Sequence, residues 1–74
     1  LMVYPNPATD ILNIYTAAEE LQSVEIFDVD GRRVLASDFT SGTINIADLS
    51  AGLYILKILD AQKAMLASTT FVKQ

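Results

Sequence analysis

Histidine, cysteine and tryptophan are all absent from this 74-residue chain, and each absence removes a class of chemistry. Without cysteine there is no disulfide to staple so small a domain and no thiol to act as a nucleophile. Without histidine the chain lacks the commonest general base and the commonest neutral metal ligand. The serines have no evident lysine partner with which to form a nucleophilic relay. We therefore expect no catalytic residue, no cofactor and no bound metal.

Basic residues are scarce as well. Five Lys and Arg against nine Asp and Glu give a formal net charge of −4 at pH 7, and an acidic surface repels phosphate backbones and anionic lipid headgroups. No apolar run approaches the roughly 18 residues that a membrane-spanning helix needs, and the chain does not open like a secretory signal peptide. We expect neither nucleic-acid binding nor membrane insertion. Because the chain starts at Leu1, we also expect a fragment of a longer polypeptide.

What is present is a strongly apolar chain of modest length. About half of the residues, 51%, are hydrophobic, which argues against disorder. At 74 residues the chain is near the lower limit for burying a self-sufficient core. We expect a single domain over residues 1–74, with a stability on the order of a few kcal/mol.

Short β-type segments alternate with turn signals along the chain. The two prolines fix their own φ and keep the preceding residues out of the helical region, so residues 4–7 should be extended. Residues 17–20 favour a helix but are too few to form one alone, and we interpret them as a connection. The β-type segments lie at residues 11–15, 24–29, 34–35, 43–46 and 53–59, with turn signals at Ser41-Gly42 and Ser50–Gly52. This spacing predicts an all-β antiparallel sandwich.

The dipeptide Asp30-Gly31 joins two of these segments. Asp-Gly between two β-type runs predicts a tight type I′ turn with positive φ at both central residues. Asp28 and Asp30 resemble part of a calcium-binding loop, but Ile26 and Ser37 would then occupy the first and last ligand positions, which need Asp and Glu. We therefore interpret this segment as a hairpin turn with solvated carboxylates.

Residues 60–68 are ambiguous on local propensity. Asp60 could cap a helix, and the alanine-rich residues 61–67 favour one slightly. The residues that follow, Ser68–Val72, are plainly β-type. The choice between helix and strand stays open at this point.

Three motifs, taken in order and at this spacing, resemble one family. They are Val3-Tyr4-Pro5-Asn6-Pro7, residues 28–34 and residues 48–54. Nearly the whole chain resembles the type A C-terminal sorting domain of the type IX secretion system, found in Bacteroidetes. The resemblance implies a seven-stranded, immunoglobulin-like antiparallel β-sandwich. It also implies a turn near Asp60-Ala61-Gln62 and a final strand through Phe71, which we adopt.

The resemblance further implies a function and its partners. The domain would be a secretion and sorting signal that directs an attached cargo protein across the outer membrane, and the sortase of the system would then remove it. The implied partners are the type IX machinery, its sortase and an upstream cargo domain. The implied location runs through the periplasm and outer membrane to the cell surface or the extracellular space.

Nine positions match family motifs, none of them catalytic. They are Pro5, Asn6, Pro7, Gly31, Gly52, Tyr54, Phe71, Val72 and Lys73. The resemblance implies that sortase cleavage lies upstream of the Pro-Asn-Pro element and that the C-terminal run Phe71-Val72-Lys73-Gln74 is presented to the machinery. From the residues alone, we expect the two glycines to allow a positive φ in the backbone. We expect Tyr54 to pack in the core with its hydroxyl hydrogen-bonded, and Lys73 to be a solvated lysine on an ordinary last strand.

Periodicity places apolar side chains on both faces of two strands. Val24, Ile26, Tyr54, Leu56 and Ile58 would face the core, so Phe27, Val29, Leu53, Ile55 and Leu59 would face outward, interrupted only by Lys57. A single sandwich buries one face of each sheet, and uncovered apolar patches mark contact surfaces. Our hypothesis is that this outer face contacts the machinery, the cargo domain or a second copy of the chain.

Two other functions stay open. A carbohydrate- or ligand-binding β-sandwich module needs an exposed aromatic platform, whereas in so small a domain we expect most of the six aromatic side chains in the core. A structural spacer domain of a surface protein predicts more sequence after Gln74.

Overall fold

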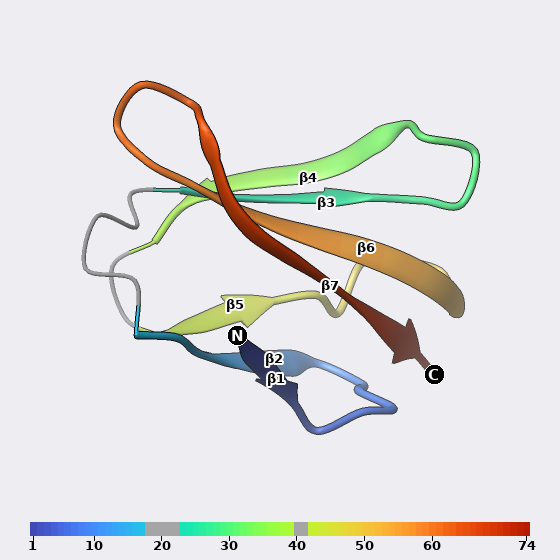
Figure 1. The fold of residues 1–74 in the computed structure, drawn as a ribbon. Coiled ribbons are helices and arrows are strands. Elements are labelled where there is room, and N and C mark those ends of the chain that lie inside the picture. The colour runs from blue at the N-terminus through green and yellow to red at the C-terminus, as the bar shows by residue number, and fades with distance from the viewer. Residues whose placement is uncertain (18–22, 40–41) are drawn as a thin grey trace.

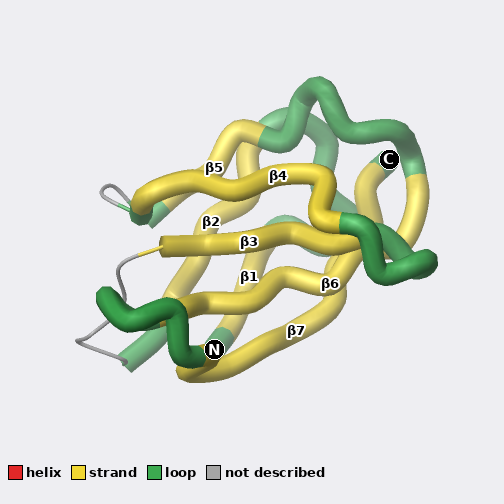
Figure 2. Tube along the Cα trace, turned by 90° about the horizontal axis from the view of Figure 1, so that it is seen from above, coloured by secondary structure: helices red, strands yellow, loops and turns green. Residues whose placement is uncertain are grey.

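The computed structural model describes residues 1–17, 23–39 and 42–74, over which the chain forms strands and turns and no helix. The strands in this part are β1 (Met2–Tyr4), β2 (Ile11–Tyr15), β3 (Ser23–Phe27), β4 (Arg33–Asp38), β5 (Thr43–Asn45), β6 (Gly52–Leu59) and β7 (Met65–Lys73). Two antiparallel sheets, ordered β1-β2-β5 and β4-β3-β6-β7, form the two layers of a sandwich (Figure 1, Figure 2). The all-β prediction is confirmed, and the strand order is that of an immunoglobulin-like sandwich.

Alternate residues of the strands build the core between the sheets. Val24 lies opposite Ile58, and Ile26 lies opposite Leu56, so the inward faces of β3 and β6 are direct neighbours. The largest fully buried side chains are Phe71, Leu12, Ile26, Ile46, Leu56, Ile58 and Val24. The predicted inward faces of these strands are therefore confirmed.

The ambiguous segment forms a turn and a strand. The Asp60 carboxylate accepts hydrogen bonds from the N–H groups of Gln62 and Ala64, both at 2.9 Å, and β7 starts at Met65. Pairing of β7 with β6 along its length outweighs the slight helix propensity of residues 61–67. The expected turn and final strand are confirmed.

Two features of the backbone differ from the predictions. Residues 5–7 bend instead of running extended, because proline fixes φ but leaves ψ free; the peptide bonds before Pro5 and Pro7 are cis. Leu59 is buried rather than outward, because the register of β6 and β7 shifts between Ile58 and Leu59 and interrupts the alternation. Of the predicted connections, residues 18–20 and Ser41 lie outside the described residues.

Candidate functional site

The proline-rich segment near the start of the chain lies against the last strand. The Ala8 N–H donates to the Val72 carbonyl, and the Gln74 N–H donates to the Ala8 carbonyl, both at 2.8 Å. These bonds form a short parallel bridge between Ala8 and Lys73. We call residues 5–8 together with residues 71–74 the terminal junction. It joins the β1–β2 connection to the edge strand of the large sheet.

Asn6 completes the terminal junction through its side chain. The Asn6 Oδ1 accepts a hydrogen bond from the Val72 N–H at 2.9 Å. An edge strand such as β7 presents N–H and C=O groups that lack a neighbouring strand, and at Val72 a side-chain amide and the Ala8 backbone replace that strand. The middle residue of the Pro-Asn-Pro element is thus a structural partner of β7.

On its other edge, β7 is supported by β6. Gly52 pairs with Lys73 and Tyr54 pairs with Phe71, and the two rings stack with centroids 5.7 Å apart. The Tyr54 hydroxyl donates to the Ser50 carbonyl at 2.6 Å, so the predicted core position of Tyr54 with a bonded hydroxyl is confirmed. The Gly-Xaa-Tyr element therefore positions Phe71, the first residue of the C-terminal part of the terminal junction.

The C-terminal run buries two side chains and exposes one. Phe71 is fully buried, Lys73 is 8% exposed, and Val72 is 39% exposed. The Lys73 ammonium donates to the Gln74 carbonyl at 3.0 Å. The interpretation of Lys73 as a solvated lysine is wrong, because strand alternation places it on the same side as Phe71. Its aliphatic stem is buried while the charged head reaches the end of the chain.

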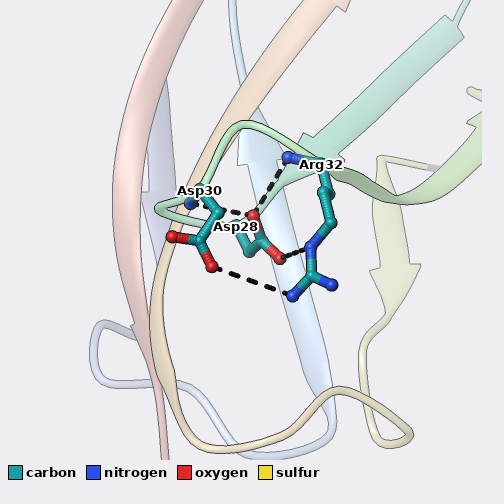
Figure 3. Close-up of polar contacts among 3 residues, drawn as sticks. All are labelled: Asp28, Asp30 and Arg32. Atoms are coloured by element: carbon teal, nitrogen blue, oxygen red, sulfur yellow. Dashed lines mark hydrogen bonds and ion pairs between the residues drawn. The ribbon is translucent and has the colours of Figure 1, made fainter.

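The β3–β4 turn is organised by the carboxylate of Asp28 (Figure 3). Its Oδ1 accepts hydrogen bonds from the N–H groups of Arg32 at 3.0 Å and Asp30 at 2.9 Å, and its Oδ2 accepts from Arg32 Nε at 3.1 Å. The backbone hydrogen bond from Arg32 is the largest cause of a lowered pKa at the Asp28 carboxyl, and the hydrogen bond from Asp30 lowers this pKa further. Partial burial of the carboxylate acts in the opposite direction and raises the pKa. Asp28 is therefore a turn-forming residue rather than a freely solvated carboxylate.

This turn is a three-residue loop, and the type I′ prediction is wrong. The Gly31 N–H donates to the Asp28 carbonyl at 3.1 Å, and the Asp28 N–H donates to the Arg32 carbonyl at 2.9 Å. Gly31 has φ 86°, whereas Asp30 is not among the residues with positive φ. A type I turn followed by a left-handed glycine has this geometry. The Asp28 side chain favours it by bonding to the loop backbone.

The family-motif residues gather at one end of the sandwich. All of them except Gly31 lie in the terminal junction or on the part of β6 that pairs with it. The turn that carries Gly31 lies toward the same end, on the right in both Figure 1 and Figure 2. Segments that the sequence separates by more than sixty positions thus share one region of the surface.

A hollow of about 250 Å³ lies elsewhere on the large sheet and includes a serine and a lysine. The Lys63 ammonium donates to the Ser23 hydroxyl at 3.4 Å, so the expectation that no serine has a lysine partner is wrong; the β6–β7 turn brings the two together. A serine–lysine relay requires the lysine to accept the serine proton, and here the lysine donates. Within the described residues, no group of three or more His, Cys, Asp or Glu is placed to hold a metal ion.

The outer face of the large sheet is only partly apolar. Leu53 is exposed, and Phe27 and Ile55 are half-buried; we call these three residues the large-sheet face. The Lys57 ammonium lies 4.5 Å above the Phe27 ring, and its stem covers part of this surface. The predicted outward orientation is confirmed for these side chains, while the lysine reduces the area that they expose.

The aromatic side chains are less buried than expected. Tyr54 and Phe71 are in the core and Phe39 packs against it, but Tyr4 and Tyr15 are 49% and 67% exposed. Both tyrosines lie on the outer face of the small sheet. Sequence reasoning missed this surface, although alternation with the inward residues of β2 points Tyr15 outward.

Comparison with known proteins identifies the family. The secretion system C-terminal sorting domain family matches residues 2–73. Over 61 residues the chain is 36% identical to Beta-agarase D of Zobellia galactanivorans, and the matched region is 82% of this chain and 12% of that protein. It is 34% identical over 61 residues to an endo-acting ulvan lyase of Formosa agariphila, covering 78% of this chain and 12% of that protein. In the described residues no helix is long and apolar enough to cross a membrane. The match over nearly its whole length means that this chain belongs to the type IX secretion system C-terminal sorting domain family.

Proposed function

We propose that this domain is the export signal of a larger secreted protein and is recognised as a folded unit. The observation that carries the proposal is the terminal junction, in which the Pro-Asn-Pro element and the C-terminal run form one surface. A signal built in this way exists only when both ends of the domain have folded together. The curated relatives, of which this chain spans 12%, are long enough to contain a separate cargo.

In this proposal the type IX machinery carries the cargo through the periplasm and across the outer membrane. Residues 1–74 act as a single C-terminal domain, and the sortase of the system cleaves upstream of Pro5. The domain itself performs no chemistry. The cargo reaches the cell surface or the extracellular medium.

The nine motif positions divide between contact and support. Pro5, Pro7 and Val72 are exposed, and we assign contact with the machinery to them. Asn6 and the buried Phe71 hold them in place. The list of supporting residues is completed by Gly31, Gly52, Tyr54 and Lys73.

The large-sheet face is a second contact surface in this proposal, and self-association is its simplest use. Sedimentation across a concentration range tests this use directly. A strict monomer that binds no apolar dye would contradict it.

An export assay tests the sorting role. A folded reporter is fused upstream of the domain, with the native linker, in a bacterium that has the type IX apparatus. One matched fusion lacks Thr70–Gln74, and a second carries Val72→Asp. The deletion removes the buried Phe71 and so disturbs the fold, whereas Val72→Asp alters an exposed side chain of the terminal junction.

The intact fusion should reach the surface or the medium, and both altered fusions should stay in the periplasm. Met65→Asp is the matched control, because Met65 is exposed at the start of β7, outside the family motifs, and its variant should be exported normally. An intact fusion that folds but is not exported contradicts the sorting role. A carbohydrate- or ligand-binding module, or a spacer domain, would then be the better assignment.

A further inference from the structure

The outer face of the small sheet carries four exposed apolar side chains from two adjacent strands. Met2, Tyr4, Ile11 and Tyr15 are 56%, 49%, 44% and 67% exposed. Met2 lies directly opposite Tyr15, and Tyr4 lies opposite Asn13, which separates Ile11 from Tyr15 on the outer side of β2. The four apolar side chains therefore surround the half-buried, uncharged Asn13 on one surface. We call these four residues the small-sheet face.

The composition of this face is that of a protein contact. The strands β1, β2 and β5, all within the described residues, contain no Asp, Glu, Lys or Arg. The centres of protein interfaces are depleted in charge and enriched in tyrosine and methionine. The large-sheet face differs in this respect, because Lys57 covers part of it and the Glu25–Arg33 ion pair joins β3 to β4 in the same sheet.

The size and position of the face decide which protein covers it. Four side chains are far fewer than the roughly 20–30 residues a side of a stable complex between free proteins. A tethered partner needs much less contact, because the linker supplies an effective concentration in the millimolar range for short flexible linkers. Met2 and Tyr4 belong to β1, the first strand of the domain, so the face lies next to the point where a preceding domain is attached.

We propose that the small-sheet face docks against the cargo domain that precedes it in the same polypeptide. This inference rests on the proposed function, which supplies the cargo domain. Docking would shield Tyr4 and Tyr15 from water and would fix the orientation of the terminal junction relative to the cargo. The contact is intramolecular, so its occupancy is independent of protein concentration.

Alkylation of single introduced cysteines tests this inference in the full-length polypeptide. The domain has no cysteine of its own, so each introduced thiol can be followed by mass spectrometry of its peptide. Tyr15→Cys probes the face, and Val29→Cys is the matched control, because both parent residues are 67% exposed. Met2→Cys, directly opposite Tyr15, is a second probe in case Tyr15→Cys disturbs the fold.

The quantity measured is the ratio of alkylation rates, Tyr15→Cys over Val29→Cys, in native protein and in denaturant. We expect the ratio to be lower by roughly tenfold or more in the native protein, because a docked face must open before the thiol reacts. An equal ratio in both conditions overturns the inference. Protection that disappears on dilution also overturns the inference and identifies a second copy of the chain as the partner. Protection that requires added agarose oligosaccharides overturns it as well and identifies a carbohydrate as the ligand. Export of the same chains is scored separately, so a chain that is exported with an unprotected thiol contradicts the docking alone.

Discussion

At the scale of single residues, the chain builds the same turn twice from different sequences. In residues 28–32 and 60–64, the first Asp accepts hydrogen bonds from N–H groups two and four residues later. The fourth residue is left-handed in both turns, with φ 86° at Gly31 and φ 66° at Lys63. The leading Asp is therefore the shared determinant, and glycine is present in only one of the two turns.

Substitution at this fourth position should lower the stability of the domain in the first turn and raise it in the second. We expect Gly31→Ala to lower the free energy of unfolding by about 1 kcal/mol; an added Cβ meets no atom within 4 Å, so the cost is conformational. Lys63→Gly should raise it by about 0.5 kcal/mol, because relief of the left-handed conformation exceeds the extra chain entropy of glycine. Lys63→Ala, which loses the bond to Ser23 but keeps the Cβ, is the control. Urea denaturation measures all three, and an unchanged Gly31→Ala variant would contradict the argument.

Asp28 should make the fold sensitive to acid. Its pKa is lowered in the folded chain, chiefly by the backbone hydrogen bond from Arg32, and is about 3.9 in an unfolded chain. The resulting stabilisation is fully present above the unfolded pKa and is lost as the pH falls through the folded pKa. The stability difference between the parent and Asp28→Asn should therefore be constant near neutral pH and shrink below about pH 4.

Denaturation at a series of pH values measures this difference. Asp30→Asn is the charge-matched control, because it removes one carboxylate from the same turn and Asp30 makes the longer 3.8 Å contact with Arg32. A pH-independent difference for Asp28→Asn would show that the carboxylate acts through its shape rather than its charge.

At the scale of the elements, alternation of apolar and polar residues predicts the strands and their inward faces, because a strand that buries one face carries an apolar residue at every second position of the sequence. The extent of β6 and the core position of Tyr54 follow in this way. Contacts between distant segments do not, since nothing around Asn6 indicates that Val72 is its partner. The burial of Leu59 and Lys73 was missed for a related reason, because a register shift and the packing at a strand end depend on pairing between strands.

The side chain of Asn6 should stabilise the attachment of the β1–β2 connection to β7. Asn6→Ala removes the acceptor for the Val72 N–H, and we expect the free energy of unfolding to fall by about 1 kcal/mol. Asn6→Asp keeps a side-chain oxygen at the same position and should lose less. Urea denaturation compares the two variants with the parent. Equal stability of all three would mean that water satisfies the Val72 N–H equally well.

At the scale of the whole molecule, a disulfide-free domain of 74 residues is expected to have a stability on the order of 4 kcal/mol, at the lower end of the usual 0.05–0.15 kcal/mol per residue. Both ends of the chain belong to the fold, since β1 starts at Met2 and β7 ends at Lys73. The terminal junction therefore forms only when the whole sandwich has formed. Recognition of this surface would distinguish a folded domain from an unfolded chain that carries the same motifs.

One export experiment can separate recognition of the terminal junction from stability of the domain. Asn6→Ala changes the terminal junction, whereas Ile44→Val removes one methylene from the core side of β5 and should cost a similar amount, about 1 kcal/mol. Both losses are well below the expected stability, so both domains stay folded. We expect export of a reporter fused to Asn6→Ala to fall several-fold and export with Ile44→Val to match the parent. Equal losses in the two variants would mean that export follows stability alone, and no loss in either would mean that the Asn6 contact is not needed for recognition.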